Sequence, residues 1–210
     1  MKQYAGYMPN GEYYMKNITE FDANQKKVET NEFSSGDKSK RKFIYKYDTK
    51  GNLIEKNGTN TNGDFYSKFT FKNDSQGNMI ELADYNKYDI MESKENLKYD
   101  ENGNEIETNR YDNNNNLKSK TIYRYDNQGN KIEEIEYSPD EKIIWRRTRS
   151  YDKKHNELER ITYDDKNKVR EKSSYKYEVF DKIGNWIRKI EFNDNSEATI
   201  ITEREVEYYK

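Results

Sequence analysis

A period of 26 residues runs through most of the chain, and it constrains the fold more than any other feature. An aspartate recurs in the same register, usually directly after an aromatic residue. The aspartates that mark the period are Asp22, Asp48, Asp74, Asp100, Asp126, Asp152 and Asp181. All but the last interval are 26 residues long, and the last is 29. Seven repeats of one supersecondary unit are therefore expected, each packing mainly against its neighbours.

Each aspartate begins a predicted hairpin turn. In the segment Asp48-Thr49-Lys50-Gly51-Asn52, the aspartate side chain can accept backbone N–H groups ahead of it. Gly51 then fits the left-handed position of a type I turn with a bulge. In four other turns this position is held by Gly77, Gly103, Gly129 and Gly184. His155 and Gln25 hold it in the remaining two turns, where some strain is expected.

A second turn is expected about halfway through each repeat. Asn115 holds its left-handed position, which asparagine tolerates better than most residues. Asn167 and Gly63 fit the same place in other repeats. These turns account for the asparagine-rich composition better than a prion-like tract does.

The segments between turns alternate as half-buried strands do. Tyr123 and Tyr125 alternate with Lys120 and Arg124, and such strands are roughly five to nine residues long. We expect an all-β fold: about seven 26-residue β-hairpin repeats, about 14 strands in all, forming one elongated, twisted antiparallel sheet. Residues 1–17 are expected to be an N-terminal lead-in or cap, and residues 18–210 the hairpin repeat domain.

The composition limits both the core and the partners. Only 31% of the residues are apolar, which predicts a thin sheet with a polar face, whether open or closed. The 38 basic and 40 acidic residues nearly cancel, which argues against a nucleic-acid partner. No stretch is apolar enough for membrane insertion, and the first residues lack the apolar region of a signal peptide. The chain therefore either stays inside the cell or lacks its export signal.

No combination of residues predicts catalysis or a cofactor. The single histidine, His155, lies in a predicted turn, and the chain has no cysteine. The loop from Asp100 to Asn104 resembles a calcium loop but lacks the spacing of an EF-hand. Carboxylates such as Glu133 and Glu134 fit a solvated strand face as well as a glycosidase pair. We expect no catalytic residues, no metal site and no enzymatic activity.

Aromatic side chains are the better candidates for ligand contact, because an exposed ring can stack on a sugar. Trp186 is the ligand-binding candidate, since its register position is expected to be mostly exposed. The alternative for Trp186 is packing against a neighbouring strand. Trp145 shares its parity with Ile143 and Tyr151 and is expected in the core, and the tyrosine columns are expected to pack within the sheet.

The turn segments resemble a known repeat. The runs from Tyr47 to Ile54 and from Tyr125 to Ile132 resemble the YD repeat of the Rhs/YD-repeat superfamily, and Tyr99 to Ile106 and Phe180 to Ile187 add two copies. MORN-like repeats are a related alternative. The Rhs/YD resemblance implies a bacterial protein, secreted or at the cell surface. It also implies strips of β-hairpins that spiral into shells around toxin domains, with carbohydrate binding in some members.

The resulting functional hypothesis is a non-enzymatic module for binding or scaffolding, with a glycan or a protein as partner. The alternative is a fragment of a Rhs-type toxin-encapsulating shell, and an enzyme is the third and least favoured reading. Because the outer strands of a repeat sheet have unpaired edges, edge-to-edge association is also expected.

Overall fold

The computed structural model describes residues 2–7, 13–34, 40–60 and 62–208. Its regular elements are sixteen β-strands, and no helix long and apolar enough to cross a membrane occurs in the described residues. The strands are β1 (Lys2–Tyr7), β2 (Tyr13–Phe21), β3 (Lys27–Ser34), β4 (Lys40–Tyr47), β5 (Leu53–Thr59), β6 (Phe65–Asn73), β7 (Met79–Tyr85), β8 (Met91–Tyr99), β9 (Glu105–Asp112), β10 (Leu117–Tyr125), β11 (Lys131–Tyr137), β12 (Ile143–Tyr151), β13 (Glu157–Tyr163), β14 (Val169–Phe180), β15 (Trp186–Phe192) and β16 (Ala198–Glu203).

The prediction of an all-β hairpin array is confirmed. The strand order in the sheet is the chain order, and the described pairings are antiparallel. The seven aspartate-marked repeats supply β3 to β16, two strands each, as expected. The lead-in predicted over residues 1–17 contributes β1 and the first part of β2, and its residues 1 and 8–12 lie outside the described residues.

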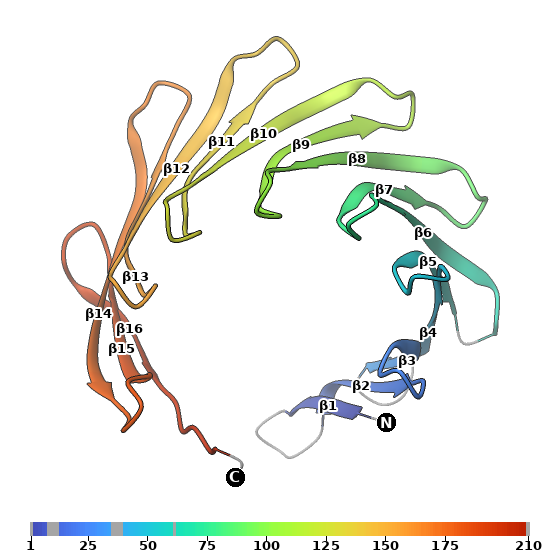
Figure 1. Cartoon of the computed structure of the whole chain (residues 1–210), viewed down its shortest axis with the longest axis horizontal. Helices are drawn as coiled ribbons and strands as arrows, with labels where there is room; N and C mark the ends of the chain where they lie inside the picture. Colours follow the sequence, from blue (N-terminus) through green and yellow to red (C-terminus); the bar gives the residue numbers. More distant parts are fainter. Residues whose placement is uncertain (1, 8–12, 35–39, 61, 209–210) are drawn as a thin grey trace. The chain divides into compact units, whose positions relative to one another are not determined.

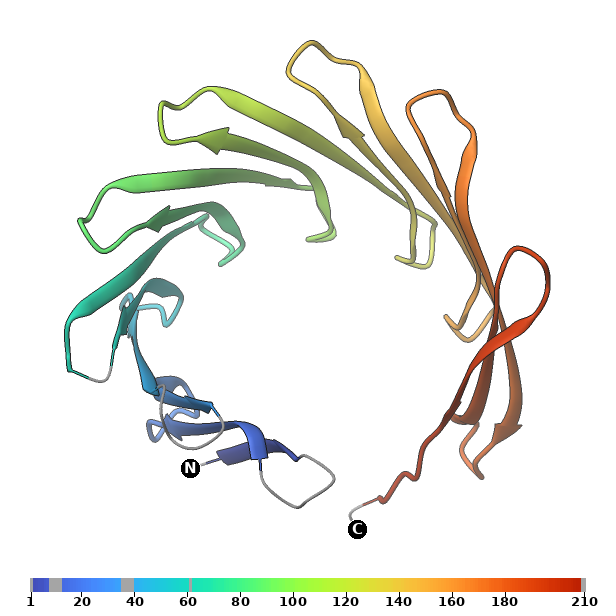
Figure 2. The ribbon, with the colours of Figure 1, turned by 180° about the vertical axis from the view of Figure 1, so that it is seen from behind.

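The chain divides into two compact units. The first consists of Met1–Tyr99 and Asn109–Lys118, and the second of Asp100–Thr108 and Ser119–Lys210. Strands β1 to β8 belong to the first unit and β11 to β16 to the second, while β9 and β10 contribute to both. Figures 1 and 2 show the consecutive hairpins side by side within each unit.

The turns have the predicted geometry. Asp100 Oδ1 accepts the backbone N–H groups of Asn102 and Asn104 at 2.9 and 2.8 Å, and Asn104 Nδ2 donates to Asp100 Oδ2 at 2.9 Å. This side-chain hydrogen bond from Asn104 is the main reason that the pKa of Asp100 is lowered. Asn52, Asn78 and Asn130 close their turns in the same way, a role that the residue pattern alone did not indicate, whereas Asn185 Nδ2 donates to the Tyr208 hydroxyl.

The left-handed positions also agree with the prediction. Gly51, Gly77, Gly103, Gly129 and Gly184 have positive φ, as do Gln25, His155, Gly63, Asn115 and Asn167. Three further residues that the sequence analysis did not single out, Asp89, Glu141 and Ser196, hold equivalent positions in the second turns, with φ near 60°. The register of the array therefore imposes this conformation even on residues that do not favour it.

A tyrosine hydroxyl connects the two strands of most repeats, and in the repeat of β5 and β6 the side chain of Asn73 does so by donating to the Leu53 carbonyl oxygen at 2.9 Å. Tyr47, Tyr99, Tyr125, Tyr151 and Tyr177 donate to the backbone carbonyl oxygen 20 residues earlier, over 2.8–3.2 Å. Tyr177 lies 26 residues after Tyr151 and therefore follows the 26-residue period. The next turn aspartate, Asp181, is displaced from that period by three residues. The twelve-residue strand β14 absorbs this insertion with register shifts after Tyr177.

The most buried side chains are small or aromatic. Thr108, Thr121 and Ala83 are each 2% exposed, while Tyr123 and Tyr175 are each 8% exposed. Many aliphatic side chains stay partly exposed, for example Ile54 at 39%. Burial therefore comes from neighbouring strands rather than from a thick apolar core, as the low apolar content predicts.

Candidate binding pocket

One face of the sheet is occupied by a repeated network of charges, and we call it the ladder face. It carries a column of glutamates with the 26-residue period, namely Glu29, Glu55, Glu81, Glu107, Glu133 and Glu159. Their basic partners lie on adjacent strands. Lys46 contacts Glu55 at 2.5 Å, Lys72 contacts Glu81 at 2.8 Å, and Arg124 and Arg146 both contact Glu133 at 2.6 Å.

Aromatic rings complete the ladder face. The ammonium of Lys68 lies 4.5 Å from the centre of the Tyr85 ring and also pairs with Asp89. Lys94 lies 5.0 Å above Tyr111, and equivalent contacts recur along the sheet. Many charged side chains of this face therefore contact one another or an aromatic ring, which favours a structural role for the face.

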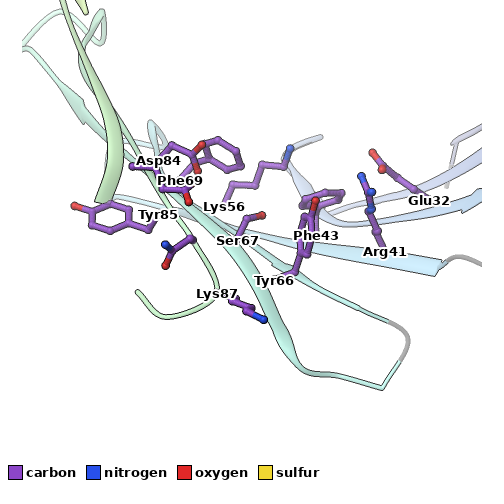
Figure 3. A pocket seen from close by; sticks show the side chains of 12 residues that line it. Glu32, Arg41, Phe43, Lys56, Tyr66, Ser67, Phe69, Asp84, Tyr85 and Lys87 are labelled. Atoms are coloured by element: carbon purple, nitrogen blue, oxygen red, sulfur yellow. The ribbon is translucent and has the colours of Figure 1, made fainter. Parts of the chain in front are cut away.

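The opposite face, which we call the pocket face, contains a cavity of about 590 Å³ in the first unit (Figure 3). Its aromatic lining consists of Phe43, Tyr66 and Phe69, together with Tyr85, whose pairing partner Lys68 lies on the ladder face. Its charged lining consists of Glu32, Arg41, Lys56, Asp84, Lys87 and Glu92. We refer to this cavity as the Phe43 pocket.

A glycine makes room for the Phe43 pocket. Gly58 on β5 pairs with Phe43 on β4 and Ser67 on β6, and both partners line the pocket. A Cβ atom at Gly58 would lie 2.9 Å from Phe43 Cε1 and 2.9 Å from Ser67 Oγ, which is closer than such contacts allow. One repeat later the same register position holds Asp84, so the glycine removes a side chain from the floor of the pocket.

Lys56 extends across two aromatic rings inside the pocket. Its ammonium lies 4.1 Å from the centre of the Phe43 ring and 5.4 Å from that of Phe69 (Figure 3). Arg41 lies 5.0 Å above the half-exposed Tyr66 in the same way. These cation–π contacts place the cationic groups over apolar surface.

The charged side chains of the pocket lack the pairing that the ladder face provides. Within the described part of the chain, Lys56, Asp84 and Glu92 form no ion pair. The same holds for Glu32, Arg41 and Lys87, so the three acidic and three basic side chains of the lining have no ion-pair partner within the described residues. Burial raises the pKa of Asp84, and the nearby Glu92 carboxylate raises it further, while a hydrogen bond from the Tyr85 backbone opposes both.

This arrangement suits the binding of a polar molecule. Aromatic faces can contact the apolar side of a sugar ring, and the charged and amide groups can bond its hydroxyls. Among the described residues, no group of three His, Asp or Glu side chains is placed to hold a metal ion.

Trp186, the predicted ligand-binding residue, lies in the second unit and is half-buried. Its ring centre is 5.7 Å from that of Tyr177, and the Arg204 guanidinium lies 3.8 Å above it. Arg204 Nε also donates to the Trp186 carbonyl oxygen at 2.5 Å. The C-terminal segment therefore covers part of the Trp186 surface, and none of the Phe43 pocket residues is near it in sequence.

The other residues considered from the sequence lie in structural positions. His155 has a φ of 63° in its turn, and its Nδ1 lies 2.7 Å from Asn130 Oδ1 of the preceding repeat. Both carboxylate oxygens of Asp100 accept hydrogen bonds within its own turn. Glu133 pairs with two arginines, and Glu134 pairs with Arg149 at 3.2 Å.

Sequence reasoning missed the Phe43 pocket. A signal was present, because Phe43 and Phe69 are consecutive copies of one register position and Gly58 interrupts a column that otherwise carries polar or charged residues. Trp145, expected in the core, is half-buried and lines a second cavity, since a single sheet offers no opposing layer to cover it.

Comparisons with known proteins show similarity in fold. No protein-family model matches the sequence, and no curated protein sequence matches it. A chain in the crystal structure of TcdB2-TccC3-Cdc42 is 14% identical, with a TM-score of 0.50 over 90% of this chain and 10% of that one. A porin-like protein from Bacteroides uniformis is 9% identical, with a TM-score of 0.53 over 94% of this chain and 91% of its own. This chain thus spans about a tenth of the first of these and nearly all of the second.

Proposed function

We propose that the chain is a non-enzymatic binding module, carried on a β-hairpin repeat scaffold, that binds a carbohydrate in the Phe43 pocket. The observation that carries the proposal is the contrast between the Phe43 pocket and the ladder face. The ladder face pairs its glutamates across strands, whereas Lys56, Asp84 and Glu92 line a cavity without an ion pair in the described structure. Charged groups that line an aromatic cavity and have no ion-pair partner are available for an incoming ligand.

A sugar fits this lining better than a strongly charged ligand. The six charged side chains of the lining are three acidic and three basic, so the pocket has no net preference for one sign. Sugar hydroxyls can both donate and accept hydrogen bonds, so they can satisfy Asp84 and Lys56 together. The rings of Phe43 and Phe69 then contact the C–H face of the sugar.

A glycan array followed by calorimetry tests the proposal. Lys56→Met keeps the alkyl chain over the two rings but removes the charge, and Asp84→Asn keeps the shape but removes the carboxylate. Each change should weaken binding of a captured glycan about tenfold, as expected for one charge-assisted hydrogen bond. Asp165→Asn, an exposed turn substitution in the second unit, is the matched control and should leave the affinity unchanged.

Two outcomes would reject carbohydrate binding at this pocket. One is the absence of binding to any glycan on the array, and the other is binding that neither substitution weakens. Conversion of a bound glycan into products during the incubation would contradict the non-enzymatic part of the proposal.

A Rhs-type shell fragment is the second candidate. The recurring tyrosine hydrogen bonds within the repeats, the YD-like turns and the fold similarity to a chain of TcdB2-TccC3-Cdc42 favour it. In that case the native polypeptide would be much longer than 210 residues and would carry further repeats. Mass measurement of the protein from its source cells, in cell and surface fractions, would separate the two candidates.

A further inference from the structure

The second cavity of the pocket face lies at the same repeat position as the Phe43 pocket. It occupies the second unit, has a volume of about 470 Å³, and we refer to it as the Trp145 pocket. Its lining follows that of the Phe43 pocket three repeats, or 78 residues, later. The register equivalents are Trp145 for Ser67, Arg147 for Phe69, Thr162 for Asp84 and Arg170 for Glu92. Four equivalent register positions therefore line both hollows with different side chains, and the position of Gly58 is held by Glu136.

The substitutions reverse the chemistry of the hollow. Arginine replaces an aromatic ring at one position and a carboxylate at another. Tryptophan replaces the serine. The remaining charged residue of the lining is Glu171. Two guanidinium groups therefore face one carboxylate in this pocket.

Arg147 is held in place by its neighbours. Its Nε donates to Thr162 Oγ1 at 3.1 Å, and its guanidinium lies 5.3 Å from the centre of the Trp145 ring. One terminal nitrogen is 4.0 Å from Glu134, at the limit of an ion pair. Trp145 is itself oriented by a hydrogen bond from Nε1 to Glu136. The aromatic ring and the first arginine are thus preorganised.

Arg170 is exposed and makes no ion pair or hydrogen bond within the described residues. Its planar guanidinium can hold a carboxylate with two parallel N–H···O bonds, a geometry that lysine cannot provide. An exposed arginine beside a fixed tryptophan ring suits a ligand that has both a ring and an anionic group.

We propose that the Trp145 pocket is a second binding site, selective for an acidic sugar, that is, a pyranose bearing a carboxylate. The ring of Trp145 stacks on the sugar. Arg170 and Arg147 bind the carboxylate, and Thr162 and Glu171 bond the hydroxyls. This site goes beyond the proposed function of the Phe43 pocket and does not depend on it, because it lies in another unit and uses other residues.

Tryptophan fluorescence tests the proposal directly. The chain has two tryptophans, so the variant Trp186→Phe leaves Trp145 as the only one. This variant is titrated with an oligosaccharide of galacturonic acid and with its methyl ester, which has the same rings but no free carboxylate. The acid should change the fluorescence and bind about tenfold or more tightly than the ester.

Substitutions then assign the preference to Arg170. Arg170→Gln, made in the same background, should abolish the preference for the acid, and this change removes no described contact. Lys166→Gln, at an exposed turn nearby, removes one positive charge and should keep the preference. Lys56→Met and Asp84→Asn should leave this titration unchanged. A result that rejects carbohydrate binding in the Phe43 pocket can therefore be distinguished from one that rejects binding in the Trp145 pocket.

Three results would overturn the assignment. The first is equal affinity for the acid and the ester, and the second is a preference that survives Arg170→Gln. The third is displacement of the acid by inorganic phosphate or polyglutamate at similar concentrations, which would show a general anion or acidic-peptide site instead.

Discussion

The hydroxyl of Tyr125 should contribute measurably to stability, although it belongs to a regular repeat. It donates to the Glu105 carbonyl oxygen at 2.8 Å, in a partly buried position in the second unit. Tyr125→Phe removes this bond and leaves the carbonyl without that partner. A lost hydrogen bond of this kind costs about 0.5–1.5 kcal/mol, and an unsatisfied buried acceptor raises the cost to about 1–3 kcal/mol. Because water can reach part of the site, we expect a loss of about 1–2 kcal/mol.

The pH dependence of this loss has a definite sign. Burial of the hydroxyl is the main reason that the pKa of Tyr125 is raised to about 12, from an ordinary value of 10.0. The folded state therefore favours the protonated tyrosine. Its contribution is complete below about pH 10 and is lost as the pH rises toward about 12. The difference in stability between the wild-type protein and Tyr125→Phe should narrow across that window.

Urea unfolding followed by circular dichroism, at neutral pH and at about pH 11, measures both effects. Tyr88→Phe is the control, since Tyr88 is 71% exposed and its hydroxyl makes no described hydrogen bond. Hydrogen exchange should show the destabilisation concentrated in β9 to β11. A loss no larger than that of Tyr88→Phe, or a difference that widens above pH 10, would refute the reasoning.

Three further substitutions test other features. Ser196→Gly should stabilise the chain by about 0.5–1 kcal/mol in thermal unfolding, because Ser196 has a φ of 61°, while Asn195→Gly in the same turn should not. Glu133→Gln should cost about 1–3 kcal/mol, less at high salt, because it removes the shared partner of two arginines; a loss independent of salt would contradict this. Asp84→Asn should stabilise the chain by about 0.2–1 kcal/mol at neutral pH, since it removes a carboxylate that is disfavoured by burial and repelled by Glu92. The raised pKa of Asp84 means that this gain should disappear as acid protonates Asp84, and a gain that persists in acid would count against it.

The local turn chemistry explains why the fold could be predicted from the sequence. Aspartate and glycine at fixed spacing specify the hairpin turns, and Asn115 and Asn167 adopt the expected left-handed conformation. Glu141 could not be predicted in this conformation from its own chemistry, because the pairing of β11 with β12 imposes it. The three-residue insertion before Asp181 was visible, but its placement after Tyr177 depends on the hydrogen bond from Tyr177 to the Glu157 carbonyl oxygen on the adjacent strand.

The binding pocket was much less predictable. A period shows which residues are equivalent, but it does not show which side chains leave a hollow between strands. The Phe43 pocket depends on the missing side chain of Gly58 and on the position of Lys56 over two rings. The surroundings of Trp186 depend on Arg204, which belongs to a C-terminal segment outside the regular strand pairing.

The identity of chain order and strand order has a mechanical consequence. Within each unit, the hydrogen bonds of a strand connect it to the strands directly before and after it. A chain of this kind has a low contact order, so each hairpin can add to the preceding ones as soon as its own residues have been synthesised. A force applied to the two ends of a unit loads the outermost hairpin first and breaks its hydrogen bonds one after another. The unit should therefore yield at low force, hairpin by hairpin, rather than rupture in a single event.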